Sequence, residues 1–199
     1  MEKLKVIKRP STLGNMLMGL GLVALIASAL LALVYGITKE PIEKAKAKKL
    51  KQAIQMVSPE FDNDPSLELY SIKLENNDSL ICYPIKKEGV QIATAIRSFS
   101  DIGFSSRIYI MIGFDNDGKI IRSSVLEHLE TPGLGDKIEK RKSDWSDQFI
   151  DLDPMGEEIK VRKDGGEIDG ITAATISSRA YCDAINRAYN MYIKEESHD

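Results

Sequence analysis

Cysteine is scarce in this chain of 199 residues, which has only Cys82 and Cys182. Iron–sulfur clusters and structural zinc sites need several closely spaced ligands, so the chain offers neither, and we expect no metal site. Whether the two cysteines form one disulfide or stay as buried thiols is left open by the sequence. A glycine-rich dinucleotide-binding loop is also absent, which leaves any NAD chemistry to other proteins.

Charged residues are missing from Pro10 to Thr38, and the stretch Leu20–Ile37 is almost wholly apolar. A helix of this length crosses about 30 Å of hydrocarbon. The stretch also exceeds the roughly 7–15 apolar residues of a signal-peptide core. The sequence therefore predicts a single retained transmembrane helix at residues 12–38, after a short tail at residues 1–11.

Basic residues lie on both sides of this span, so the positive-inside rule alone does not give its orientation. Ten of the 27 Lys and Arg residues, but only three of the 30 Asp and Glu residues, lie in residues 1–51. The rest of the chain is therefore strongly acidic. Such a surface repels the phosphates of nucleic acids, and we exclude nucleic acid as a partner.

After the span, the pattern predicts a helix and then an antiparallel sheet. Pro41 suits the first turn of a new helix, so residues 39–58 are interpreted as a stalk helix whose far end packs onto a domain at residues 59–199. Turn signals at Asn76-Asn77-Asp78 and Asp115-Asn116-Asp117-Gly118 favour tight hairpins. The apolar runs around them predict five strands: Leu69–Leu74, Leu80–Ile85, Gln91–Ser98, Ile108–Phe114 and Ile120–Val125.

The remaining residues predict helices that pack on this sheet. Thr131–Phe149 is interpreted as a loop with a short helical segment, and a last strand is expected near Ile159–Arg162, before a turn at Asp164-Gly165-Gly166. A helix from about Ile176 to Ile193 carries two apolar stripes at helical spacing, namely Tyr181, Ile185, Tyr189 and Tyr192, and Ala180, Ala184 and Ala188. The fold class is α+β, behind a membrane anchor.

Hydroxyl and small side chains are concentrated from Asp169 to Arg179, where the last helix begins. Unpaired N–H groups and the positive end of the helix dipole make such a start suitable for a phosphate. An ordinary capped helix start, with Thr175 or Ser177 as the cap, explains the same residues from physics alone. The residue pattern by itself leaves both interpretations open.

The same segment resembles the flavin-attachment motif of FMN-binding domains, in which an Asp precedes Ser or Thr, Gly, Ala and an acceptor Thr. By this resemblance Asp169, Thr172 and Ala174 match the motif, and Thr175 is the acceptor that a flavin transferase joins to FMN through a phosphoester, with FAD as donor. The chain departs from the motif at Ala173, where Gly is usual. If that Gly takes a positive φ, the methyl group costs roughly 1 kcal/mol.

A second segment, His128-Leu129-Glu130-Thr131-Pro132-Gly133-Leu134-Gly135, is similar to the loop beside the flavin in the G subunit of Rnf-type ferredoxin:NAD oxidoreductases and the C subunit of sodium-pumping NADH:quinone reductases. The resemblance implies that Thr131 and Leu134 contact the isoalloxazine ring, with Glu130 next to them. A plain Pro-Gly turn with a solvated Glu130 is the alternative.

Three further residues near the motif are candidates for contacts with the FMN phosphate. Lys163 lies just ahead of the motif and could meet the phosphate, although a solvated lysine at a strand end explains it equally well. Ser177 and Ser178 could donate to the phosphate from the first helical turn, or simply cap it. His128 is interpreted as structural. We expect no catalytic residue in the chain itself.

The resemblance implies an electron-transfer subunit with covalent FMN. The complex it belongs to would couple electron flow between ferredoxin and NAD to the movement of Na⁺ or H⁺ across the membrane. Its partners would be the other membrane and iron–sulfur subunits, and a flavin transferase would mature it. In both families the domain faces away from the cytoplasm, which implies a single-pass protein of the cytoplasmic (inner) membrane with a periplasmic domain. A stand-alone flavinylated carrier and a tethered FMN-sensing or assembly module remain as alternatives.

Overall fold

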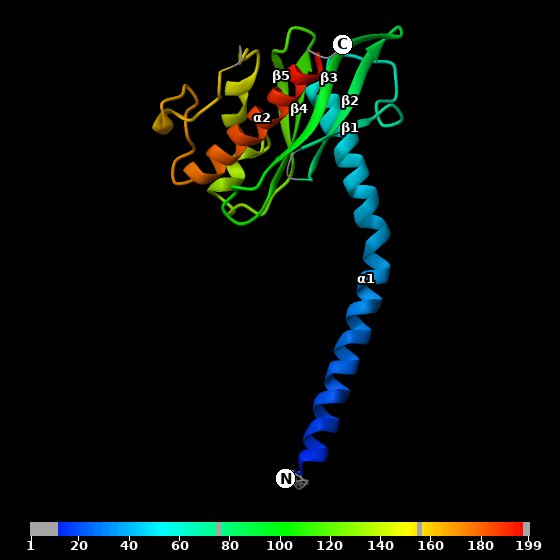
Figure 1. Cartoon of the computed structure of the whole chain (residues 1–199). Helices are drawn as coiled ribbons and strands as arrows, with labels where there is room; N and C mark the ends of the chain where they lie inside the picture. The colour runs from blue at the N-terminus through cyan, green and yellow to red at the C-terminus, as the bar shows by residue number, and fades with distance from the viewer. Residues whose placement is uncertain (1–11, 75–76, 155–156, 197–199) are drawn as a thin grey trace. The chain divides into compact units, whose positions relative to one another are not determined.

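The computed structural model describes residues 12–74, 77–154 and 157–196. The chain divides into two compact units, with the boundary between Lys48 and Lys49. The first unit contains most of α1 (Leu13–Val57), and the second contains a five-stranded sheet and α2 (Thr175–Glu196) (Figure 1).

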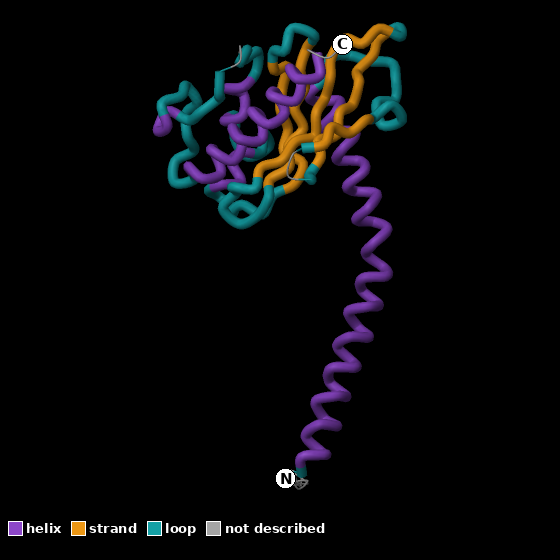
Figure 2. The backbone as a smooth tube through the Cα atoms, in the orientation of Figure 1, coloured by secondary structure: helices purple, strands orange, loops and turns teal. Residues whose placement is uncertain are grey.

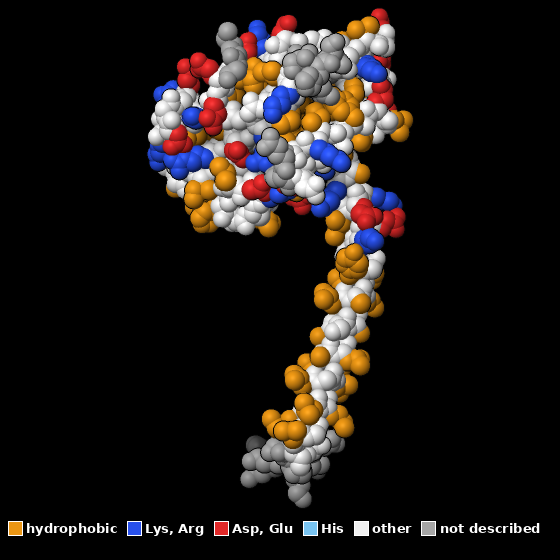
Figure 3. All heavy atoms as spheres, in the orientation of Figure 1, with side chains coloured by type: hydrophobic (Ala, Val, Ile, Leu, Met, Phe, Trp, Pro, Cys, Tyr) orange, Lys and Arg blue, Asp and Glu red, His pale blue; other side chains and the backbone are white. Residues whose placement is uncertain are grey.

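Helix α1 is the only helix among the described residues that is long and apolar enough to cross a membrane. Its Leu, Ile, Val and Met side chains up to Ile37 are exposed, and Figure 3 shows such side chains along the visible face of the helix, as a lipid-facing span requires. This agrees with the span predicted from the missing charges. The first eleven residues, where a tail was expected, lie outside the described residues.

The prediction that a new helix begins at Pro41 was wrong, because α1 runs through this residue without a break. Proline removes one backbone donor, but the Lys, Glu and Ala residues that follow are strong helix formers. Glu40 and Lys44 also form an i,i+4 ion pair at 2.6 Å, which supports the helix locally. The stalk and the span are therefore one element.

The sheet is antiparallel throughout, in the order β1-β2-β3-β4-β5, so each strand pairs with the next along the chain (Figure 2). Its strands are β1 (Tyr70–Lys73), β2 (Ser79–Lys87), β3 (Val90–Ser100), β4 (Ile108–Asp115) and β5 (Ile120–Glu127). The five predicted strands are thus confirmed, with ends shifted by a few residues. The turn after β4 is closed by the Gly118 N–H, which donates to the Asp115 carbonyl at 3.1 Å. Of the other predicted turn, Asn76 lies outside the described residues.

Both faces of the sheet are apolar and both are covered by a helix. Alternate residues of β3 and β4 point to opposite sides, as in any strand, so Ile96 and Ile112 join the cluster under α2 while Ala95 and Met111 join the cluster under the end of α1. The last turns of α1 bury Ala53, Ile54 and Val57. Residues 49–57 therefore form a structural layer of the domain, as expected of the far end of the stalk.

Helix α2 buries the predicted tyrosine and alanine stripes against the other face. The Tyr181 hydroxyl donates to Ser123 Oγ at 2.7 Å, and burial raises the pKa of Tyr181. Cys82 and Cys182 are both buried in this cluster and are not joined in a disulfide. Burial raises the pKa of the Cys182 thiol to about 12, so this sulfur stays protonated and unreactive at neutral pH.

The prediction of a strand near Ile159–Arg162 was wrong. Only an isolated parallel bridge joins Val161 to Ile168, and a 3-10 turn, η3 (Arg162–Asp164), ends at Gly165 in the left-handed region with φ 86°. The chain reverses here too tightly for a partner strand. The loop and short helix predicted for Thr131–Phe149 contain two 3-10 helices, η1 (Gly135–Ile138) and η2 (Trp145–Phe149).

Replacing Gly113 with alanine should destabilise the domain, because a Cβ at this position would lie 1.8 Å from the Val57 carbonyl oxygen. Overpacking of this kind costs about 1–3 kcal/mol. We expect urea unfolding of the full-length protein in detergent to shift to lower denaturant. Gly170→Ala is the matched control, since nothing lies within 4 Å of its Cβ; equal midpoints for the two variants would contradict the close packing of α1 on β4.

Candidate functional site

A cavity of about 340 Å³ brings the two sequence motifs together. One wall comes from the loop after β5 and the other from the start of α2, and a third segment, between β3 and β4, contributes Phe104. The lining residues are Phe104, Glu130, Thr131, Leu134, Gly135, Ala173, Ala174, Thr175, Ile176 and Ser177.

The loop after β5 is held in a tight turn. The N–H of Leu134 donates to the Thr131 carbonyl at 3.2 Å, and Gly133 takes the positive φ of 78° that the turn requires. Thr131 and Leu134 are both exposed at the cavity. The predicted Pro-Gly turn is present, and it directs these two residues to the site.

Glu130 is not solvated, because only 4% of it is exposed. One carboxylate oxygen accepts the N–H of Phe104 at 2.8 Å, and the other accepts the hydroxyl of Ser177. Gly135 makes room for this arrangement, since a Cβ there would lie 2.5 Å from Ser177 Oγ and 2.8 Å from Glu130 Oε2. The carboxylate thus connects all three segments that line the cavity.

His128 fixes the backbone of the same loop. Its Nδ1 accepts the Glu130 N–H at 3.0 Å, so Nε2 carries the ring hydrogen and donates to Glu139 Oε1 at 2.7 Å. Burial by itself would raise the pKa of Glu139, but hydrogen bonds from Arg141 and His128 outweigh it and hold the pKa below its usual value. The structural role predicted for His128 fits these contacts.

The segment before α2 is held by its backbone. The Trp145 indole N–H donates to the Asp169 carbonyl, and the Asp169 N–H donates to Gln148 Oε1 at 2.7 Å. Ser178 Oγ accepts the Ile171 N–H at 2.9 Å. These contacts set the direction in which the chain enters the helix.

Thr175 is the first residue of α2, and its hydroxyl oxygen accepts a hydrogen bond from Lys163 Nζ at 3.2 Å. The Ser178 N–H already donates to the Ala174 carbonyl at 3.1 Å, while the amides ahead of it in the first turn have no intrahelical acceptor. A hydroxyl, a cationic side chain and free amide groups thus meet at one edge of the cavity.

Ala173 adopts φ 63°, in the left-handed region. This is the backbone that the glycine of the motif would take without strain, and the expected cost of the extra methyl group therefore applies here. The condition under which the extra methyl group was expected to cost free energy is therefore met at Ala173.

The donor set fits an FMN molecule. The helix start with Lys163 and Thr175 suits a phosphate, since charge-assisted hydrogen bonds and unpaired amides favour an anion. Exposed apolar side chains of Phe104, Leu134 and Ile176 line the rest of the cavity, as a flat apolar ring requires.

The predicted site residues divide into two groups. Six of them lie at the cavity or at its edge: Glu130, Thr131, Leu134, Ala174, Thr175 and Ser177, with Lys163 in contact with Thr175. Asp169 and Thr172 are exposed outside the lining, and the Asp169 carboxylate pairs with Arg162 at 3.0 Å. Ser178 is fully buried, and its hydroxyl is engaged by Ile171 and the Ala174 carbonyl, which does not favour a contact with phosphate.

Sequence reasoning missed Phe104, Gly135 and Ile176 as lining residues. Gly135 and Ile176 stand beside predicted residues and could have been included by adjacency. Phe104 lies in neither motif, and only its place between two predicted strands offered a signal.

Comparison with known families agrees with this geometry. Residues 103–190 match the family model of the FMN-binding domain, and this stretch contains every residue that lines the cavity. Residues 18–57 match the model of the RnfG N-terminal region. The fold and the site therefore define an FMN-binding domain that follows an N-terminal helix able to span a membrane.

Relatives similar over most of their length share one name, as the G subunit of the ion-translocating oxidoreductase complex. The chain is 36% identical to that of Shewanella piezotolerans over 185 residues, covering 88% of this chain and 87% of the relative. It is 35% identical to that of Vibrio cholerae and 37% identical to that of Yersinia pestis, with 85% of each chain covered. The chain belongs to this G-subunit family.

Replacing Ala173 with glycine should stabilise the protein by about 1 kcal/mol, because glycine takes a positive φ without the steric cost of a Cβ. Urea unfolding of the full-length protein in detergent measures the gain. Ala174→Gly is the control, since Ala174 is not among the residues with positive φ and the change there should destabilise. A loss of stability in Ala173→Gly would argue against the left-handed conformation.

Replacing Glu139 with glutamine should destabilise the protein at neutral pH. A carboxyl whose pKa is lowered on folding stabilises the protein above its unfolded pKa, near 4.5, and this contribution is lost as the pH falls through the folded pKa. The gap between wild type and variant in unfolding midpoint should therefore narrow below that pH. The exposed Glu167→Gln serves as control; a gap independent of pH would contradict this account.

Proposed function

We propose that this chain is the electron-transfer subunit of a membrane-bound ion-translocating oxidoreductase and carries FMN covalently on Thr175. The observation that supports it most is that Thr175 and the loop at residues 130–135 line one cavity, with Lys163 bonded to the Thr175 hydroxyl at its edge. The shared name of the relatives supplies the oxidoreductase complex.

Each residue of the site has a separate task in this proposal. Thr175 Oγ1 forms the phosphoester with FMN, which a flavin transferase makes from FAD as AMP leaves and the threonine gives up its proton. Lys163 offsets the charge of the phosphate, together with the amides of the first turn of α2, while the hydroxyl of Ser177 is already donated to Glu130. Thr131 and Leu134 contact the ring. Bound FMN supplies one- and two-electron transfer.

The remainder of the reaction belongs to other subunits. The described residues include no cluster of His, Cys, Asp or Glu that could hold a metal, and iron–sulfur partners would deliver and remove the electrons. In the proposed complex, electron flow between ferredoxin and NAD is coupled to the movement of Na⁺ or H⁺ across the cytoplasmic membrane. Helix α1 anchors the chain, and the domain lies on the periplasmic side. A covalent bond keeps the flavin from being lost there.

Replacing Thr175 with alanine should abolish covalent flavin, while Thr175→Ser should retain part of it because a hydroxyl remains. The measurement is in-gel flavin fluorescence of the denatured full-length protein after co-production with a flavin transferase, followed by peptide mass mapping.

Lys163→Gln should slow labelling severalfold through the lost charge-assisted hydrogen bond. Thr38→Ala, outside the FMN-binding match, should label like wild type.

Persistence of flavin in Thr175→Ala would exclude this residue as acceptor. Absence of flavin from the wild-type protein, with the transferase verified on another substrate, would favour a noncovalent FMN-binding or assembly role instead. That second function draws its support from the left-handed Ala173, where the motif has glycine.

A further inference from the structure

Phe104 is an exposed aromatic residue at the mouth of the cavity, outside both sequence motifs. All five phenylalanines lie in described segments, and Phe104 is the only one that is largely exposed, with 65% of its surface accessible. Phe99, Phe114 and Phe149 are buried in the core. Exposing so large an apolar side chain to water costs free energy, and a ligand bound in the cavity would remove this cost by covering the ring.

The backbone of Phe104 is held in place although its side chain is exposed. Its N–H donates to the buried Glu130 carboxylate at 2.8 Å. The preceding Gly103 is constrained as well, because a Cβ there would lie 2.2 Å from the Ser106 carbonyl oxygen and 3.0 Å from Glu130 Oε1. The exposure of Phe104 is therefore a property of an ordered loop.

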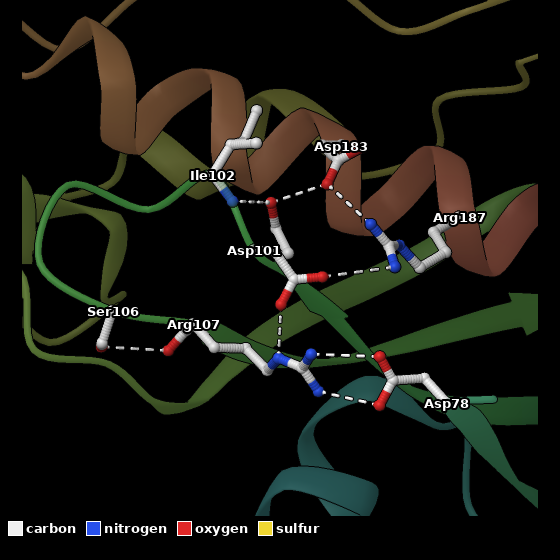
Figure 4. A network of polar contacts seen from close by, with 8 residues as sticks. Asp78, Asp101, Ile102, Ser106, Arg107, Asp183 and Arg187 are labelled. Atoms are coloured by element: carbon white, nitrogen blue, oxygen red, sulfur yellow. Dashed lines mark hydrogen bonds and ion pairs between the residues drawn. The ribbon is translucent and has the colours of Figure 1, made fainter. Parts of the chain in front are cut away.

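A network of ion pairs fixes both ends of this loop (Figure 4). Arg107 donates to both carboxylate oxygens of Asp78 at 3.1 Å and to Asp101 at 2.6 Å. Arg187 of α2 lies 3.8 Å from the other oxygen of Asp101. At the end of β3, the Ser100 hydroxyl donates to Asp183 of α2 at 2.6 Å. The loop that carries Phe104 is thus tied to the same helix that carries Thr175.

Three apolar side chains from three separate segments surround the cavity: Phe104, Leu134 and Ile176, which are 65%, 41% and 44% exposed. Glu130 links the same three segments, since it belongs to the loop of Leu134 and binds the Phe104 N–H and the Ser177 hydroxyl. One carboxylate therefore connects the three segments that carry these apolar groups.

We propose that Phe104 packs on the isoalloxazine ring and shields it from solvent, and that Glu130 is the positioning residue that holds Phe104 against it. This inference rests on the proposed function, because it needs a flavin in the cavity. An aromatic side chain gains from an offset or edge contact with a flat ring, and the apolar Leu134 and Ile176 complete the enclosure.

The test measures how far iodide quenches the flavin fluorescence of full-length, flavin-labelled protein in detergent. Phe104→Ala should raise the quenching constant about twofold or more through the loss of aromatic cover, while Phe104→Tyr should stay near wild type. Ile102→Ala is the matched control, because Ile102 lies in the same loop, is 53% exposed and does not line the cavity. Equal quenching constants for Phe104→Ala and wild type would overturn the proposal.

The positioning role of Glu130 has its own readout. If Glu130 acts through Phe104, Glu130→Ala should raise the quenching constant as Phe104→Ala does, and the double variant should exceed neither single variant. Glu130→Gln keeps one carbonyl acceptor for the Phe104 N–H and should restore most of the shielding. Additive effects in the double variant would refute the positioning role.

Attachment and shielding are measured separately, so the two proposals fail separately. The mass of the Thr175 peptide reports attachment whatever the ring environment. If the wild-type chain takes up no covalent flavin, the same variants are titrated with FMN, and Phe104→Ala should bind more weakly than Ile102→Ala. Equal affinities in that titration would reject Phe104 as a ring contact.

Discussion

The domain depends on the burial of a sheet that is apolar on both faces. A sheet of this kind is stable in water only when each face is covered, and here the cover comes from two helices that lie far apart in the sequence. Residues 49–57 of α1 cover Ala95 and Met111 on one face, while α2 covers Ile96 and Ile112 on the other. The flavin site is built where the second of these helices begins, so its geometry follows from how that face is packed.

Within the site, one buried carboxylate holds the surrounding loops in place. Glu130 accepts hydrogen bonds from two segments outside its own loop, and the glycines at 103 and 135 leave room for it. Burying a carboxylate is unfavourable unless its oxygens are satisfied, so the loops are held where they satisfy it. The shape of the cavity is therefore set before any ligand arrives.

Short apolar runs bounded by turn signals were enough to predict the five strands, and the helical spacing of apolar residues predicted the buried stripes of α2. The motifs also predicted most of the residues that line the cavity. The prediction of a last strand was wrong. Val161 and Ile168 are residue types common in strands, but the left-handed Gly165 between them reverses the chain. Phe104 and the burial of Glu130 could not be predicted, since both depend on contacts between segments distant in sequence. The predicted helix start at Pro41 was wrong because strong helix formers around a proline can outweigh the one backbone hydrogen bond that it removes.

The layer formed by residues 49–57 has a consequence for how the protein can be divided. Removing the whole of α1 to obtain a soluble fragment would strip the cover from Tyr83, Ile85 and Met111 and leave an apolar face open to self-association. A fragment that starts at Lys49 keeps that cover and still omits the apolar span. The border between the apolar span and the FMN-binding domain thus falls inside a single helix, and residues 49–57 of that helix belong to the domain.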